Sequence, residues 1–248
     1  MTDKTPVIIS IASGKGGVGK TCITINLAAA LSGKDKRVLV IDCDLGLANI
    51  DIMLGINPQS NLKDVLFKDI DVREVLIRTK AGFDFIPASS GSREMAQLLN
   101  ENIERLKDLM VEISGGYDYV FLDIGAGISD TVLQLNLFAS RNFVIVSRDL
   151  TSMTDAYALM KMINQGFGKQ GFELIVNSVR DDKEGLKVFN HIASICKRFL
   201  NFSPRYLGSI PFDEVIPRSI MKQSVFVNLF PRSSAAVMLN RIIDTISL

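Results

Sequence analysis

The chain has 248 residues, 47% of them hydrophobic and 22% charged, which is enough apolar material for one sizeable core. Its 28 basic and 27 acidic residues give a formal net charge of +1, which excludes the strong overall field that draws a protein to nucleic acid or to acidic substrates. The cysteines, Cys22, Cys43 and Cys196, show no CxxC spacing, so we expect neither a disulfide nor a zinc framework, and a cytoplasmic location.

Short runs of β-branched residues alternate with longer segments of helical period, a pattern typical of βαβ units. We expect strands at residues 7–13, 37–42, 83–89, 119–124, 142–147, 172–179 and 206–211. Helical spacing marks residues 20–32, 92–113, 129–140, 152–165 and 183–200, and Asp71 with Glu74 resembles a capping box that opens a short helix. The sequence therefore predicts a single α/β domain over residues 1–248. Its mostly parallel, doubly wound sheet has seven strands, in an order that the sequence leaves open, with helices on both faces.

Residues 14–21, GKGGVGKT, fit the pattern G-x-x-x-x-G-K-[ST] and lie between an expected strand and an expected helix. The glycines let the backbone bend around phosphate oxygens while N–H groups at the helix start point at the anion. We expect Lys20 to reach the β- and γ-phosphates of ATP and the Thr21 hydroxyl to bind Mg²⁺. A Gly-rich turn without a ligand is the alternative, which the complete motif disfavours, so we expect a P-loop NTPase. The expected ATP- or ADP-binding residues of this segment are Gly14, Lys15, Gly16, Gly17, Val18, Gly19, Lys20, Thr21 and Cys22.

Aspartates stand at the ends of two expected strands. Asp42 and Asp44 follow RVLVI, and Asp123 follows YVFL. Because ligands of parallel α/β sheets bind at the carboxyl ends of the strands, we expect these carboxylates beside the loop. A hydrophobic strand that ends in aspartate after such a loop is a candidate Walker B segment, which holds Mg²⁺. An aspartate of this kind alone is more often a cap or a turn residue; the loop favours the metal-binding interpretation.

Lys15 is a lysine that the ordinary loop pattern does not require. Here the sequence resembles, over essentially its whole length, the MinD/ParA family of ATPases with a deviant Walker A motif, KGGVGKT at residues 15–21. The resemblance implies an ATP-dependent homodimer in which Lys15 crosses to the phosphates bound by the partner subunit. Burying two positively charged faces against each other requires a polyanion between them, and ATP supplies one. A solvated loop charge is the alternative for this lysine considered alone.

The same resemblance implies roles for the aspartates. Asp44, in DCDLGLANID, matches the aspartate that positions the attacking water, and Asp42 matches one that lies near the metal. Asp123 matches the Walker B aspartate, followed by GAG. The implied catalytic residues are Asp44, Lys15 and Lys20, and the implied Mg²⁺ site consists of Thr21, Asp42 and Asp123.

Two later segments are similar to the family's base-binding residues. Asn177, in LIVNSVR, resembles the asparagine that binds adenine, and an amide can pair with the donor and acceptor edge of that base. A strand-end turn residue is an equal alternative for Asn177 taken alone. Pro211 and Asp213, in IPFDE, resemble the segment that lines the base.

Four stretches are similar to the branch of the family that regulates flagellar number and placement: DLGLANIDIMLGI, IPASSGSREMAQL, LDIGAGIS and TSMTDAYALMKMI. This likeness implies partners among flagellar regulators, flagellar switch proteins or a signal-recognition-type GTPase. The segment SSAAVMLNRIIDTISL has an apolar stripe through Val237, Met238, Ile242 and Ile246 but only one basic residue, Arg241. We therefore expect a helix that packs on the core, with peripheral contact at the inner face of the cell membrane as the weaker alternative.

Other functions stay open within the same fold. A ParA-type DNA-partitioning or division-site ATPase would bind DNA without sequence preference through residues such as Lys197, Arg198, Arg205, Arg218 and Lys222, whose usual place is a solvated face. A nucleotide-binding scaffold without hydrolysis would not need Asp44. A nitrogenase-type iron protein would need a cysteine after Asp123 for its cluster, so Cys22 and Cys43 are better interpreted as small packing residues. We interpret the single histidine, His191, as a helix-surface residue.

Overall fold

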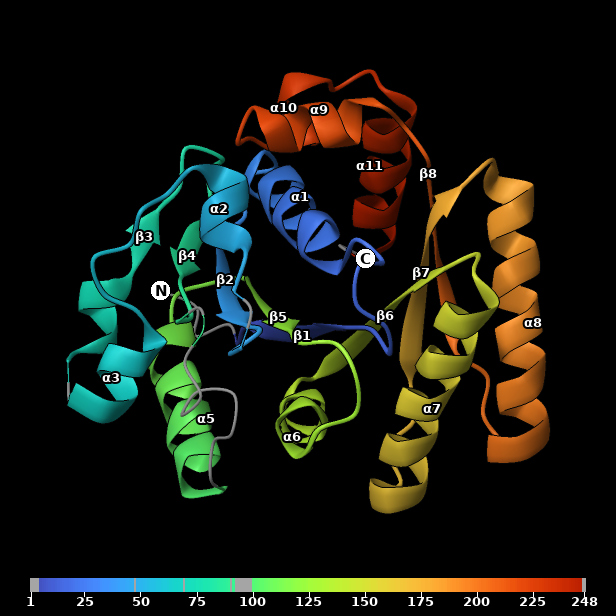
Figure 1. The fold of residues 1–248 in the computed structure, drawn as a ribbon, viewed down its shortest axis with the longest axis horizontal. Helices are drawn as coiled ribbons and strands as arrows, with labels where there is room; N and C mark the ends of the chain where they lie inside the picture. The colour runs from blue at the N-terminus through green and yellow to red at the C-terminus, as the bar shows by residue number, and fades with distance from the viewer. Residues whose placement is uncertain (1–4, 47, 69, 90, 92–99, 247–248) are drawn as a thin grey trace.

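The structure is a computed structural model, and it describes residues 5–46, 48–68, 70–89, 91 and 100–246 (Figure 1). The expected helix over residues 92–113 lies partly outside this range. Its described part is α5, Asn100–Ser114. Within the described residues, no helix combines the length and the apolar character that crossing a bilayer requires.

The described strands form one eight-stranded sheet in the order β3-β4-β2-β5-β1-β6-β7-β8. All pairs of neighbours are parallel except β3 with β4. The seven expected strands are confirmed, and the sequence missed β3, a two-residue strand. Because β1 lies between β5 and β6, the loop that follows it opens near the middle of the carboxyl edge of the sheet. The strands are β1 Val7–Ala12, β2 Val38–Cys43, β3 Ile77–Arg78, β4 Asp84–Ile86, β5 Tyr119–Ile124, β6 Arg141–Ser147, β7 Phe172–Val179 and β8 Arg205–Pro211.

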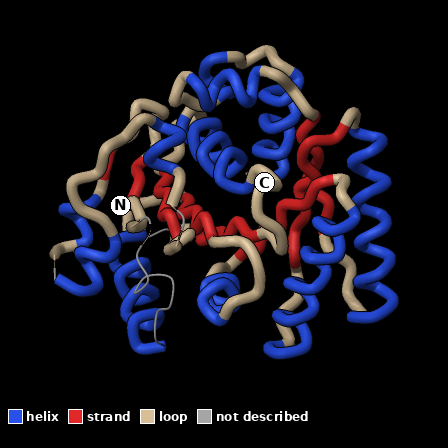
Figure 2. The backbone as a smooth tube through the Cα atoms, viewed as in Figure 1, coloured by secondary structure: helices blue, strands red, loops and turns tan. Residues whose placement is uncertain are grey.

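Helices cover both faces of the sheet, so the strands are buried on both sides, as their continuous apolar character predicts (Figure 2). One core layer packs the sheet against α3 (Leu62–Lys68), α5, α6 (Asp130–Phe138), α7 (Leu150–Phe167) and α8 (Asp182–Leu200). The other packs it against α1 (Lys20–Ser32), α2 (Ile50–Leu54), α9 (Val215–Met221), α10 (Phe226–Leu229) and α11 (Ser234–Ile246). The expected short helix after Asp71 is a single 3₁₀ turn, Val72–Val75, and the Asp71 carboxylate accepts a hydrogen bond from the N–H of Arg73.

The C-terminal helix α11 packs against β8 and α1, as the expected core-packing role requires. The sequence prediction placed its buried stripe partly wrong. Ile242 and Ile246 are buried, but Val237 is 42% exposed. The helical period explains the difference, because the face that contains Ile242 continues through Leu239 and Ala235 and leaves Val237 on the opposite side.

Candidate nucleotide-binding site

The loop after β1 can adopt its path only with glycine at several positions. A Cβ atom on Gly14 would lie 2.1 Å from the backbone carbonyl carbon of Asp155 in α7. Gly17 and Gly19 have φ angles of +78° and +91°, in the left-handed region that favours glycine. Helix α1 begins directly after Gly19, at Lys20. The geometry is therefore that of a strand, a tight loop and a helix whose first N–H groups open onto a cavity.

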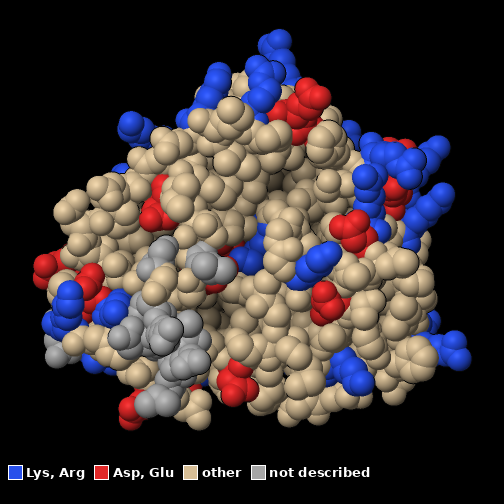
Figure 3. Space-filling view, in the orientation of Figure 1, with Lys and Arg blue, Asp and Glu red and all other residues tan. Residues whose placement is uncertain are grey.

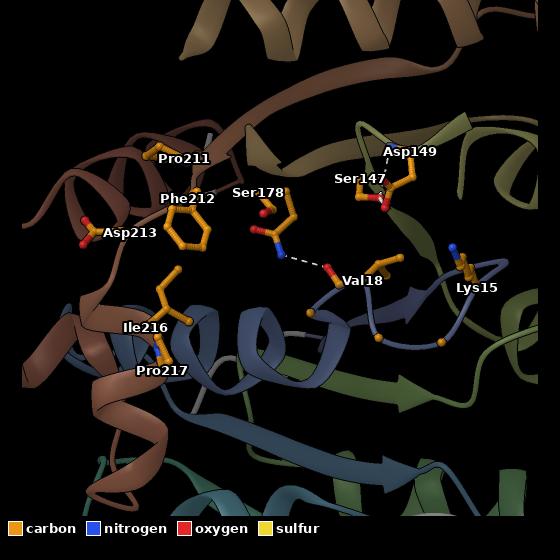
Figure 4. Close-up of a pocket in the computed structure, with 14 residues that line it drawn as sticks. Lys15, Val18, Ser147, Asp149, Ser178, Pro211, Phe212, Asp213, Ile216 and Pro217 are labelled. Carbon is orange, nitrogen blue, oxygen red and sulfur yellow. Dashed lines mark hydrogen bonds between the residues drawn. The ribbon is translucent and has the colours of Figure 1, made fainter. Parts of the chain in front are cut away.

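Asn177 lies at the end of β7, which is separated from β1 by β6, and its side chain contacts this loop. Its Nδ2 donates a hydrogen bond to the backbone oxygen of Val18 at 2.8 Å (Figure 4). The same Nδ2 would lie 2.3 Å from a Cβ atom on Gly19. Asn177 thus anchors the loop to the sheet, a role that the sequence analysis did not find. Its adenine-binding role stays a prediction.

A cavity of about 410 Å³ lies between the loop and the β8–α9 connection, within the size range of small-molecule sites. Its polar end is the loop, and its apolar end is formed by Pro211, Phe212 and Ile216 (Figure 4). The Phe212 side chain is 68% exposed and was not a predicted site residue. Gly16, Gly17, Val18, Gly19, Lys15, Asn177, Pro211 and Asp213 all line this cavity, as expected of a nucleotide site.

Asp213 contributes to the site mainly by shaping it. Its Oδ1 accepts from the N–H of Val215, and its Oδ2 accepts from Ser234 Oγ at 2.7 Å and from the N–H of Ala235. Burial raises the pKa of Asp213, but these hydrogen bonds outweigh burial and lower the pKa overall. The carboxylate points away from Ser178 (Figure 4). It joins the starts of α9 and α11, and so fixes the wall of the cavity.

The carboxylates at the ends of β2 and β5 lie beside the loop, as expected. Asp123 Oδ1 accepts from Lys20 Nζ at 3.2 Å and from Thr24 Oγ1 at 2.9 Å. Asp42 is the register partner of Asp123, and its Oδ1 accepts from the N–H of Asp44 at 3.0 Å. Thr24 was not predicted, because one hydroxyl in an apolar helix carries no pattern.

Asp42 and Asp123 fit the cation that their sequence positions imply. The Oδ2 atom of each is buried and accepts no hydrogen bond from any described residue. Burial, followed by the negative charge of Asp123, holds the pKa of Asp42 well above its usual range. Two orphaned carboxylate oxygens beside a phosphate-binding loop match the hard oxygen ligands that Mg²⁺ takes.

Thr21, Cys22 and Asp44 line a second cavity of about 400 Å³, on the side of the loop that faces α2. The Asp44 side chain also approaches the segment after β5, where its Oδ1 would lie 3.3 Å from a Cβ atom on Gly125. Burial raises the pKa of the Cys22 thiol to about 12 and holds the pKa of the Cys43 thiol well above its usual range. Both thiols are therefore kept neutral, which agrees with the packing interpretation.

Lys15 and Lys20 are in different environments although they belong to one loop. Lys20 is 7% exposed and reaches the buried Asp123, whereas Lys15 is exposed. Lys15 Nζ donates to Thr151 Oγ1 in α7 at 2.8 Å, and its backbone oxygen accepts from Ser13 Oγ at 2.9 Å. The two lysines therefore differ in the structure: Lys20, which the ordinary pattern requires, is buried in an ion pair, and Lys15, the additional one, is exposed.

This strand, loop and helix, with a strand-end aspartate on the loop lysine, define a P-loop nucleotide-binding domain. The AAA domain family matches residues 6–171. The chain is 36% identical over 230 residues to the antiactivator FleN of Pseudomonas aeruginosa, covering 93% of this chain and 82% of FleN. It is 33% identical over 227 residues to the flagellum site-determining protein YlxH of Helicobacter pylori, covering 90% of this chain and 76% of YlxH.

Among solved structures, the septum site-determining protein MinD of Pyrococcus horikoshii, complexed with Mg-ADP, superposes with a TM-score of 0.81. The match covers 97% of this chain and 96% of that one at 24% identity, and it shows the shared fold. The chain belongs to the MinD/ParA family of P-loop ATPases, and its similarity to FleN supports a place near the flagellar-number branch, whose members are called FlhG or FleN.

Proposed function

We propose that this chain is an ATP-hydrolysing switch that dimerises on binding Mg·ATP and regulates flagellar number or placement. The observation that carries the switch is the contrast between the two loop lysines. Lys20 forms an ion pair with the buried Asp123, while Lys15 is exposed and makes no ion pair with any described residue. An exposed, unpaired cation at the mouth of a polyanion site is available to a second subunit's nucleotide.

Within one subunit, the loop from Gly14 to Thr21 binds the phosphates through its N–H groups and Lys20, as its strand-loop-helix geometry supports. Pro211 and Phe212 cover the base at the apolar end of the cavity, and Asn177 recognises its edge. Thr21, Asp42 and Asp123 hold Mg²⁺, which neutralises charge on the phosphates when bound. Asp44 faces the loop from the other cavity and orients the attacking water.

The switch is tested by sedimentation velocity in Mg²⁺ with a non-hydrolysable ATP analogue. Wild type should be monomeric without nucleotide and dimeric with it. Lys15→Ala should stay monomeric while calorimetry still shows binding of the analogue, and Lys20→Ala should lose the binding itself. Lys34→Ala is the control, since this lysine is exposed and pairs with Asp244. A wild-type chain that stays monomeric at saturating nucleotide, or a Lys15→Ala chain that dimerises normally, contradicts the switch.

The flagellar role is supported by the relatives, one named an antiactivator and one named flagellum site-determining. It implies a flagellar regulator, a switch protein or a signal-recognition-type GTPase as partner. Deleting the gene should change the number or position of flagella per cell, as counted by electron microscopy, and wild-type protein should restore it. Unchanged flagella in the deletion strain would contradict the flagellar role but would not contradict the ATP-dependent switch.

The DNA-partitioning alternative gains no support from the arrangement of the basic residues. Lys197 and Arg198 lie on α8, on one side of the sheet, and Arg218 and Lys222 lie on or beside α9, on the other. On the face in Figure 3, the basic side chains are scattered over the top, the right, the lower left and the centre, with acidic ones among them. A steep loss of DNA affinity with added salt would nevertheless favour that alternative.

A further inference from the structure

Helix α7 holds the loop at two adjacent places. The backbone of Asp155 leaves no room for a Cβ atom on Gly14, and Thr151, one turn earlier, accepts the hydrogen bond from Lys15 Nζ at 2.8 Å. Lys15 and Thr151 are 136 residues apart in sequence. The additional lysine is therefore held against its own subunit by a helix that the loop packs on.

The hydrogen bond between Lys15 and Thr151 is weak for two physical reasons. Both side chains are exposed, so water competes for the hydrogen bond. Thr151 is the second residue of α7, and the positive end of a helix dipole does not favour an ammonium group. The described residues offer Lys15 this one neutral side-chain acceptor and no carboxylate within ion-pair distance. A polyanion can therefore draw Lys15 away.

We infer that Thr151 is a positioning residue that holds Lys15 against its own subunit and thereby opposes dimerisation. The inference rests on the proposed function, in which Lys15 contacts nucleotide across the dimer. For Lys15 to leave, the Thr151 hydrogen bond must break, once in each subunit of a symmetric dimer. Two separate monomers thus have together two contacts, one in each, that the dimer lacks.

The variant that tests this is Thr151→Val, which removes the hydroxyl and keeps the shape of the side chain. A net hydrogen bond at the weak end of the usual range, counted twice, corresponds to a dimer dissociation constant that falls by roughly 5- to 30-fold. Thr151→Ser keeps a hydroxyl at the same place and should behave as wild type. Thr154→Val is the matched control, because Thr154 is also exposed on α7 but its Oγ1 donates to the backbone oxygen of Leu150.

The measurement is the dimer dissociation constant by sedimentation equilibrium in Mg²⁺ with a non-hydrolysable ATP analogue. Tighter dimerisation of Thr151→Val alone supports the inference. An unchanged or weaker dimer overturns it, and so does an equal gain in Thr151→Ser or Thr154→Val. If wild type never dimerises, the proposed function has failed, and a second measurement still tests the contact. The ¹⁵Nζ resonance of Lys15 in the nucleotide-free protein, assigned through Lys15→Arg, should shift in Thr151→Val and not in Thr154→Val.

Discussion

Asp42 and Asp123 face each other as register partners at the carboxyl ends of β2 and β5, and each keeps one buried carboxylate oxygen without a hydrogen bond from the described residues. Of these two aspartates, Asp123 is the one that forms an ion pair with Lys20 among the described residues. With both carboxylates ionised, the pair would carry more negative charge than its protein surroundings compensate, and the pKa of Asp42 is raised accordingly by burial and by Asp123. A site of this kind costs stability in the free protein and gains it when a cation binds.

Replacing Asp42 separates these two effects. Burial and the charge of Asp123 raise the pKa of Asp42, so folding at neutral pH works against the ionised form of this carboxyl group. Asp42→Asn removes that penalty, so the free energy of unfolding of the nucleotide-free protein should rise by about 1 kcal/mol or more. The additional stability that wild type gains from Mg·ATP should shrink. Urea unfolding with and without Mg·ATP measures both quantities. Asp244→Asn, at an exposed pair with Lys34, should change neither by more than about 0.5 kcal/mol. Equal stabilisation of Asp42→Asn and wild type by Mg·ATP would take Asp42 out of the metal site.

Asn177 has two separable roles, one found in the structure and one predicted. Asn177→Ala removes the hydrogen bond to Val18, so the nucleotide-free protein should lose about 1 kcal/mol of stability, as thermal unfolding would show. If Asn177 also recognises adenine, calorimetry should show a smaller preference of the variant for ATP over GTP. Asn190→Ala, at an exposed position of α8, is the control. A variant that is destabilised but keeps the full preference would leave Asn177 as a loop anchor only.

The prediction from sequence succeeded where the signal is local. Seven strands were found because each is a continuous apolar run, and β3 was missed because two residues carry no such run. The loop was found because its motif is contiguous in the sequence. The strand-end aspartates were found because each follows an apolar run directly. Contacts such as Asn177 to Val18, 159 residues apart, depend on strand order, which periodicity does not determine. Thr151 was missed for the same reason.

The C-terminal helix offers a test of its packing role. Ile242 is buried and lies close to Gly208 of β8, where a Cβ atom would be 2.8 Å from Ile242 Cγ1. Ile242→Ala should therefore cost about 2–5 kcal/mol of unfolding free energy. Val237→Ala, on the exposed side of α11, should cost less than about 0.5 kcal/mol. Guanidinium unfolding of both variants measures the difference. If Ile242→Ala instead unfolds as wild type does and has lost binding to anionic vesicles, α11 is a membrane contact.

Asp44 provides the sharpest test of hydrolysis. It is two residues beyond Asp42, and its backbone N–H, rather than its side chain, bonds to the Asp42 carboxylate. Its side chain lines the cavity beside Gly16 and Gly17. A carboxylate there can orient water without contributing to nucleotide binding, so Asp44→Ala should bind Mg·ATP and dimerise normally. Phosphate release should fall by roughly 100-fold, and the dimer should persist, because the step that ends the ATP state is slow.

Asp42→Asn should instead weaken Mg·ATP binding itself. Phosphate release and dimer lifetime, followed in the same Mg·ATP sample, decide the assignment, and turnover by Asp44→Ala within a few-fold of wild type would exclude Asp44 from the mechanism.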